Sequence, residues 1–274
     1  MNSILVSLIL SIGFGFSAPD QGQTAPKPEG KVVYQFVTNL KGIPVTRTAT
    51  LYFNQSSSVF LHSQGKGPKL FDASGNEVSM EVMKSTDVTN KGRLFDGFIQ
   101  DPIGNVYFKD FAAKELQFRE IVMVEPFLVQ EPDWIEFDWK LEDGQKKIGR
   151  FNCQKASTHF RGRDYTAWYT TDVPVSNGPW KFHGLSGLIL EVEDASGEVA
   201  FQFQSIEIPL EVSDMQILPP TDGKKADLET FMEAERKMQE KIVQAQRAKA
   251  ARDRNAVSKS YEVGLINRVE KKLD

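Results

Sequence analysis

The side chains best able to do chemistry in this sequence are one cysteine and three histidines. Cys153, His159 and His183 lie in one stretch of the chain, whereas His62 lies far upstream. A thiol beside an imidazole can form the nucleophile and base of a hydrolase, and a carboxylate such as Asp172 could orient the ring. These residues define the only cysteine–histidine chemistry that the sequence offers.

The spacing of these residues does not strengthen the case for an enzyme. If residues 146–156 form a strand, His159 falls in the following turn and meets Cys153 only by an accident of strand pairing. Ser186 stands in Gly184-Leu185-Ser186-Gly187, which lacks the G-x-S-x-G spacing of a nucleophile elbow. The sequence has no H-x-x-x-H or C-x-x-C pair, so we expect no metal and no cofactor. An envelope hydrolase with its site near residues 159–187 is the alternative to a non-enzymatic role, which we favour.

Composition narrows the function classes further. The 33 basic and 37 acidic residues give a net charge of −4, without the basic excess that nucleic-acid binding calls for. A single cysteine excludes an intramolecular disulfide, and Cys153 in a strand-like stretch is expected to be a buried free thiol. The 19 phenylalanines favour sheets over helices.

The N-terminus has the pattern of a signal peptide over residues 1–18. An apolar run from Ile4 to Phe16 is too short to span a bilayer and is followed by the small residues Ser17 and Ala18. Because residues 1–8 contain no Lys or Arg, a buried or disordered N-terminus is the competing interpretation. We expect an exported protein (periplasmic, outer-membrane associated or secreted) with no transmembrane segment in the mature chain.

Short segments with period-two alternation follow a Pro- and Gly-rich linker at residues 19–30. At Ile135–Leu141 the alternate residues are apolar and the residues between them are charged, which predicts a half-buried strand. The same alternation predicts strands at Val33–Val37, Leu188–Val192 and Val199–Phe203.

Turn signals separate these segments. Asp72–Gly75, Asp101–Gly104 and Asp194–Gly197 each place Asp first and Gly fourth, and Asp143-Gly144 predicts a tight hairpin. Strands joined by short turns pair antiparallel, because parallel pairs need long crossovers. Residues 31–218 are therefore predicted to form one mainly β domain, a single antiparallel meander curved into a bent sheet or open half-barrel.

Residues 219–274 are predicted to form a charged helical tail, with the main helix between about 222 and 255. Its apolar stripe is narrow and consists of Leu228, Phe231, Met238, Ile242 and Ala245. Three interpretations stay open: the helix docks on the sheet, it pairs with a partner helix and gives an oligomer, or it is solvated on its own.

Residues 146–193 carry an ordered set of motifs. The run Gly184-Leu185-Ser186-Gly187-Leu188-Ile189 follows Pro174, Gly178, Pro179, Lys181 and Phe182, and before them come Arg163, Tyr165, Ala167, Trp168 and Tyr169. This pattern closely resembles the GLPGLI family of exported proteins from Bacteroidetes-type bacteria, with Ser186 in place of the naming proline. The resemblance implies a signal peptide and an envelope location. The biochemical role of the family is unassigned, so the resemblance implies no catalytic residue; some members occur beside TonB-dependent outer-membrane receptors.

The loop that carries this motif brackets aromatic rings with glycines and a proline. In one interpretation its glycines form a bulge and the rings plug the end of the sheet. In the other, the rings line a groove that takes an apolar small molecule, a peptide or an outer-membrane protein on the concave face of the sheet. The candidate ligand-binding residues are Arg163, Trp168, Gly178, Trp180, Phe182, Gly184, Leu185 and Gly187.

Overall fold

The structure is a computed structural model that describes residues 29–40, 43–62, 70–71, 77–78, 103–122, 125–211 and 215–252. The predicted signal peptide, nearly all of the predicted linker and the predicted turn at Asp72–Gly75 lie outside these residues.

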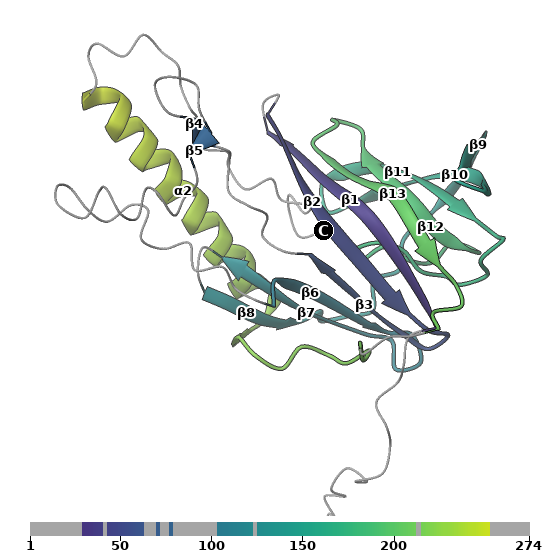
Figure 1. The fold of residues 1–274 in the computed structure, drawn as a ribbon. Coiled ribbons are helices and arrows are strands. Elements are labelled where there is room, and N and C mark those ends of the chain that lie inside the picture. The colour runs from purple at the N-terminus through teal and green to yellow at the C-terminus, as the bar shows by residue number, and fades with distance from the viewer. Residues whose placement is uncertain are drawn as a thin grey trace, which may run out of the picture.

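In the described residues, twelve strands form one large sheet, and eleven of them make up two meanders joined side by side (Figure 1). The first meander contains β1 (Gly30–Leu40), β2 (Ile43–Phe53), β3 (Ser57–His62), β6 (Asn105–Asp110), β7 (Glu115–Val122) and β8 (Glu125–Gln130). The second contains β9 (Lys140–Ile148), β10 (Phe151–Phe160), β11 (Arg163–Thr170), β12 (Leu188–Asp194) and β13 (Val199–Glu207). The pairing of β1 with β13 joins the two meanders. All strand pairs within the meanders, and the pair that joins them, run antiparallel, as predicted.

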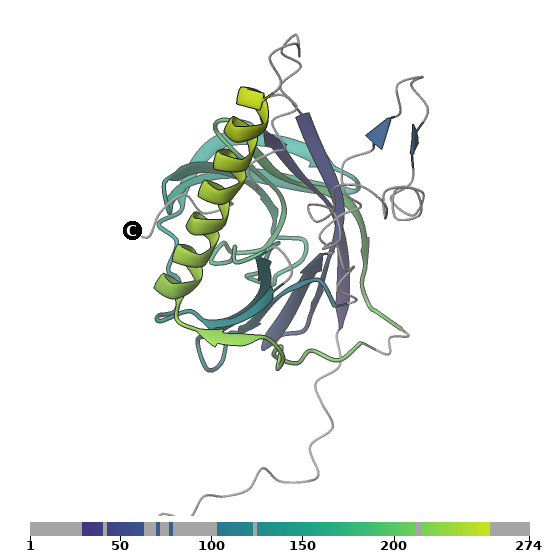
Figure 2. The ribbon, with the colours of Figure 1, turned by 90° about the vertical axis from the view of Figure 1, so that its left-hand side faces the viewer.

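Three further strands lie beyond these meanders. β14 (Lys224–Ala226) adds to the edge of β8 in parallel, so the segment that follows the predicted domain boundary at residue 218 first contributes to the sheet. β4 (Leu70–Phe71) and β5 (Glu77–Val78) form a separate two-stranded sheet. The large sheet ends at β14 on one side and β9 on the other, and it curls into an open half-barrel, as Figure 2 shows.

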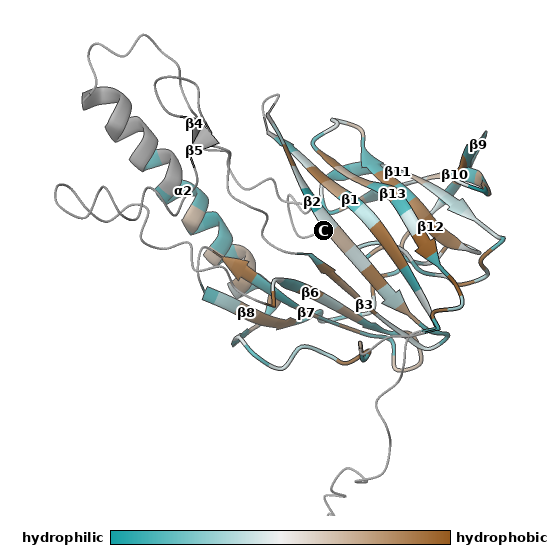
Figure 3. Cartoon of the chain, in the orientation of Figure 1, coloured by the Kyte–Doolittle hydropathy of each residue, from teal (hydrophilic) through white to brown (hydrophobic). Residues whose placement is uncertain are grey.

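The alternation predicted from the sequence decides which side chains face the concave side. Along β1, Val32, Tyr34 and Phe36 are buried, and hydrophobic and hydrophilic bands alternate along this and neighbouring strands (Figure 3). The ring of Phe36 stacks on that of Phe201 of β13, with centroids 4.6 Å apart, so the junction of the two meanders is sealed by aromatic contact.

The prediction of a strand at Ile135–Leu141 is wrong for most of the segment, but the predicted burial of its alternate apolar side chains is partly confirmed. Residues 131–139 form no strand; they connect β8, near one edge of the sheet, with β9 at the other edge. Ile135 is buried and the rings of Phe137 and Trp139 pack on Phe182, whereas Leu141, in β9, is 70% exposed. The alternation of apolar and charged residues here therefore marks an extended segment with one apolar side, which lies across the concave face and forms no strand pair before β9.

The predicted hairpin at Asp143-Gly144 is also wrong. Glu142 pairs with Lys155 and Gln145 with Gln154, so Asp143 and Gly144 form a bulge inside β9. The β9–β10 hairpin turns instead after Ile148, where Gly149 has a φ of 54°. A bulge on an edge strand hinders pairing with another chain, which is a physical reason for its position.

The predicted turn at Asp194–Gly197 is confirmed. The N–H of Gly197 donates to the carbonyl of Asp194 over 2.9 Å, and Gly197 has a φ of 68°, which only glycine adopts without strain.

The C-terminal helix α2 (Leu228–Arg252) docks on the sheet, which is the first of the three interpretations. Leu228, Phe231 and Met232 are buried against β7 and β8, and the ring of Phe231 lies edge-on to Phe118 (5.3 Å) and Phe127 (5.9 Å). The helix begins with Asp227 accepting the N–H of Thr230 over 2.7 Å. The helix that the structure describes is not apolar enough to cross a membrane. Pairing of α2 with a partner helix stays a prediction.

Replacing Phe231 with Ala should detach the first turns of α2 from the sheet. We expect the free energy of unfolding to fall by about 3 kcal/mol, because a buried aromatic side chain is lost. Urea denaturation followed by circular dichroism measures this, with the exposed Lys237→Ala as control. An F231A protein as stable as the wild type would show that the helix does not dock in solution.

Candidate functional site

The loop between β11 and β12, residues 171–187, folds into the concave side of the sheet. Its rings are buried: Trp180 is 3% exposed and Phe182 is fully buried. Phe182 contacts Tyr165 (4.9 Å), Trp180 (5.2 Å) and Phe137 (5.3 Å) through their rings. Trp180 has a φ of 51°, a strained value for a bulky residue that the surrounding packing must offset. Both rings therefore fill the interior.

The glycines of this loop allow the chain to approach its neighbours closely. A Cβ at Gly187 would lie 2.0 Å from the backbone oxygen of Thr170, and one at Gly178 would lie 2.8 Å from the Cβ of Ile189. Gly184 has a φ of 97°, which disfavours any other residue. The glycines in the loop part of the motif therefore serve close packing in this structure.

A buried carboxylate ties the loop to two other parts of the chain. Glu131 accepts hydrogen bonds from Arg161 at 3.1 and 2.7 Å and is bonded to the ammonium of Lys181, which lies 4.2 Å from the Phe118 ring centre. Burial alone would raise the pKa of Glu131, but the charges and hydrogen bonds of Lys181 and Arg161 together lower it below its usual value. The carboxylate is therefore ionised and bridges two cations.

Another buried lysine, Lys109, holds the loop through backbone groups. Its ammonium donates to the carbonyls of Gly178 (2.9 Å) and Phe182 (3.0 Å), and burial lowers its pKa well below the usual value. Next to it, the ring of His183 packs on that of Trp134 in a tilted arrangement, with centroids 4.3 Å apart, and its backbone carbonyl accepts the Trp139 indole N–H over 2.7 Å. Burial and the charge of Lys109 lower the pKa of His183 to about 3, so its ring is neutral at pH 7.

Arg163, another predicted ligand-binding residue, is engaged in a buried ion pair. Its guanidinium donates to Asp194 (2.6 Å) and Glu198 (2.8 Å). Burial alone would raise the pKa of Asp194, but hydrogen bonds from Ser196, the Val199 N–H and Arg163 lower it. This pair fixes the turn between β12 and β13.

The structure does not bring the cysteine and histidine candidates together. Cys153 is buried, and burial and the charge of Glu191 raise its pKa to about 11, so its thiol is protonated at pH 7. His159 is exposed and lies 2.6 Å from Asp164 on the neighbouring strand. These groups do not form an activated nucleophile.

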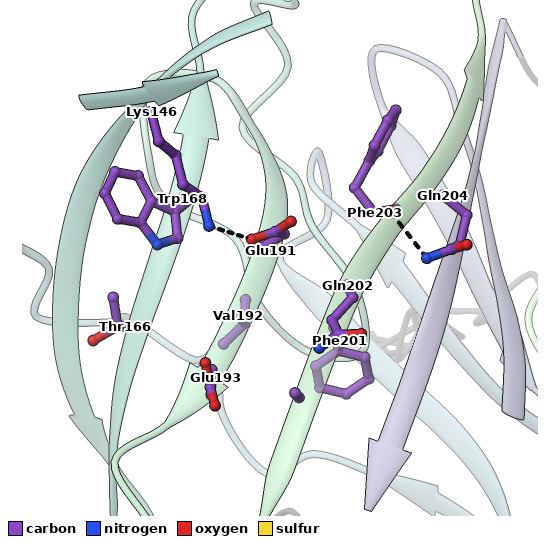
Figure 4. A pocket seen from close by; sticks show the side chains of 11 residues that line it. Lys146, Thr166, Trp168, Glu191, Val192, Glu193, Phe201, Gln202, Phe203 and Gln204 are labelled. Atoms are coloured by element: carbon purple, nitrogen blue, oxygen red, sulfur yellow. Dashed lines mark hydrogen bonds and ion pairs between the residues drawn. The ribbon is translucent and has the colours of Figure 1, made fainter. Parts of the chain in front are cut away.

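A groove of about 270 Å³ lies on the outer face of the sheet, where β12 and β13 part (Figure 4). The two strands pair only at Val192↔Phe201 and Glu193↔Ala200 and then diverge. The side chains and backbone around the groove come from β9, β11, β12 and β13: Lys146, Thr166, Trp168, Glu191, Val192, Glu193, Ala200, Phe201, Gln202, Phe203 and Gln204.

One ion pair organises the wall of this groove. The ammonium of Lys146 lies 2.5 Å from a carboxylate oxygen of Glu191 and 4.6 Å from the ring centre of Trp168. As Figure 4 shows, Lys146 reaches from β9 past Trp168 to β12. Three strands therefore contribute to one fixed cluster of an indole, an ammonium and a carboxylate.

The interior loop explains why β12 and β13 separate at this point. The N–H of Ile189 donates to the backbone carbonyl of Asn177 over 2.9 Å, and its carbonyl accepts the hydroxyl of Tyr34 over 2.7 Å. Since these groups of β12 are bonded to the loop and to a β1 side chain, they do not form a ladder with β13.

Of the eight predicted ligand-binding residues, Trp168 alone lines the outer groove. The six loop residues (Gly178, Trp180, Phe182, Gly184, Leu185 and Gly187) and Arg163 serve packing or ion pairing, and ligand binding by them stays a prediction. The other groove residues were not predicted from the sequence. The one sequence feature that points to them is the polar side of the alternating strands, at Glu191, Glu193 and Gln202. That signal does not distinguish a groove from an ordinary solvated face.

Comparison with known proteins adds one short family match. A family described as a protein of unknown function (Porph_ging) matches residues 161–191, which include the whole interior loop and fall inside the stretch that resembles the GLPGLI family. A search of curated proteins finds no relative of this chain.

Several solved structures are similar to this chain at low identity. Two structures of PNGF-II have 16% and 15% identity and a TM-score of 0.48; each match covers 75% of this chain and 32% of that one. A DUF1329 family protein from Desulfovibrio piger has 10% identity and a TM-score of 0.27, with 68% and 88% covered. A LolA superfamily protein from Nitrosomonas europaea has 12% identity and a TM-score of 0.26, with 69% and 89% covered. The chain thus spans about a third of the length of PNGF-II.

Replacing Glu131 with Gln should remove the buried carboxylate that Arg161 and Lys181 share. We expect a loss of about 3–5 kcal/mol in the free energy of unfolding, the range for breaking a buried ion pair. Chemical denaturation measures it, and the exposed Glu136→Gln serves as control. Equal stability of E131Q and E136Q would rule out the bridging role of Glu131.

Replacing His183 with Phe should change how stability depends on pH. Because the unfolded chain takes up a proton near pH 6.5 and the folded one only near pH 3, stability from this residue is complete above pH 6.5 and is lost progressively as the pH falls toward 3. Between pH 7 and pH 5 the wild type should therefore lose roughly 2 kcal/mol more than H183F. Parallel stability curves for the two proteins, measured by denaturation at each pH, would contradict this.

Proposed function

We propose that this protein is a non-enzymatic binding protein, exported to the cell envelope, that holds a small ligand in the outer groove beside Lys146, Trp168 and Glu191. The observation that carries the proposal is the groove itself, a hollow lined by side chains from four strands in which an ion pair and an indole fix the wall. Export is supported by the signal-peptide pattern of residues 1–18 and by the resemblance of residues 146–193 to an exported family.

The concave face is the less favoured place for a ligand. Two segments of the chain itself lie there, residues 131–139 and 171–187, and their rings pack on those of the sheet. Displacing them would expose large apolar side chains and separate the buried pair of Glu131 and Lys181, which is costly. The loop therefore acts as a rigid support for the groove above it, because it holds Ile189 of β12.

Pre-organisation favours binding at this groove. Lys146 has a long, flexible side chain, but its contacts with Glu191 and Trp168 already restrict it before any ligand arrives. A ligand that accepts a hydrogen bond from the ammonium would not have to order it, which reduces the entropy that binding must offset.

The test compares two neighbouring lysines on β9. The chain is purified from its native envelope, and molecules bound to it are identified by mass spectrometry and then titrated back. Lys146→Met should weaken binding at least tenfold, since it removes the ammonium and leaves Glu191 unpaired. Lys147→Met, next to it and outside the groove lining, should leave binding unchanged.

Two results would overturn the proposal. One is the recovery of no bound molecule in repeated purifications. The other is a ligand whose affinity is the same for K146M, K147M and the wild type, which would place its site elsewhere.

A further inference from the structure

We infer that the ligand of the outer groove is a neutral, polyhydroxylated molecule, of the size of one or two sugar units. This inference rests on the proposed function and specifies the chemical class that the groove accepts.

The charged residues that line the groove disfavour a charged ligand. Lys146 carries one positive charge and Glu191 and Glu193 carry two negative charges, and Lys146 is already paired with Glu191. The two carboxylates repel an anion, and the one ammonium that could attract it is paired with Glu191. A cation is attracted by Glu193, but the ammonium of Lys146 already lies against the ring of Trp168, the indole that would otherwise bind it, and repels it there. A neutral ligand meets neither repulsion.

The polar groups that remain include both donors and acceptors. Gln202 and Gln204 each offer an amide N–H₂ and an amide oxygen, Thr166 offers a hydroxyl, and Glu193 offers acceptor oxygens. Part of the Gln204 amide is already directed, since its N–H₂ donates to the carbonyl of Phe203 over 3.1 Å. A sugar hydroxyl both donates and accepts, so a ring with several hydroxyls can satisfy this mixed set. An apolar ligand would bury these groups without partners.

A peptide that binds as an added strand is disfavoured, because backbone groups of Ile189, where β12 and β13 separate, are already hydrogen-bonded. An added strand would need free N–H and C=O groups where β12 and β13 part. The N–H and C=O of Ile189 are bonded to Asn177 and Tyr34, so this part of β12 cannot accept a strand.

The size of the groove agrees with one or two sugar units. A volume of about 270 Å³ lies just below the usual range of about 300–1,000 Å³ for pockets that enclose drug-sized ligands. The groove lies on the outer face of the sheet, so a longer saccharide could continue beyond it into solvent.

The experiment titrates the mature chain with neutral sugars by calorimetry and by NMR. The probes are glucose, galactose, mannose, N-acetylglucosamine, maltose and cellobiose. At least one should bind, and Glu193→Ala or Gln202→Ala should weaken it by roughly tenfold or more. The matched changes Glu136→Ala and Gln130→Ala lie outside the groove lining and should have no effect. Between 50 and 500 mM NaCl the affinity should change less than twofold, because a neutral ligand is little affected by screening.

Each other outcome contradicts the inference in a distinct way. If no sugar binds, but a charged molecule or a peptide from the envelope binds the wild type and not K146M, the ligand class is wrong and the groove remains the site. If a sugar binds equally well to the wild type, E193A and Q202A, it does not occupy the groove. If no sugar binds and no molecule co-purifies, the inference and the proposed function both fail.

Discussion

The structure depends on the need to fill the concave side of a strongly curled sheet. A sheet of twelve strands that does not close leaves its inner apolar face open to water, and this chain covers that face with segments of its own. Residues 131–139 and the loop 171–187 supply the rings, and α2 covers β7 and β8. These segments come from distant parts of the chain, and two buried side chains hold them together. Glu131 forms a charge-assisted hydrogen bond with Lys181 of the loop, and Lys109 donates to two backbone carbonyls of the loop.

Filling the inside also shapes the outside. The loop bonds to the backbone of Ile189, and as a result β12 leaves β13 after two residue pairs and a groove forms on the opposite face. The loop part of the motif, residues 171–187, and the groove are therefore linked through β12, although no residue of the loop lines the groove.

The fold was more predictable from the sequence than the candidate site. Strong alternation and turn residues predicted the strands near β12 and β13, their antiparallel pairing and the curved, open sheet, since these signals are local. The prediction of a strand at Ile135–Leu141 failed because alternation shows which side of a segment is apolar and not whether its backbone pairs with another strand. The burial of Glu131 and Lys109 could not be predicted, because each looks like a surface residue until distant segments meet. Trp168, which lines the groove, was predicted as a ligand-binding residue from its type and neighbours, and that role stays a prediction. Its partner Lys146 comes from a strand two places away in the sheet.

The pairing of β1 with β13 has a consequence for how the protein is made. Lys31 lies opposite Glu207, so the strand that begins the sheet lacks one neighbour until nearly the whole domain has been synthesised. Contacts between residues so far apart form late and slowly. A newly made chain therefore stays unfolded for longer than one built from local contacts, and an unfolded chain is the form that can be threaded through a narrow translocation channel.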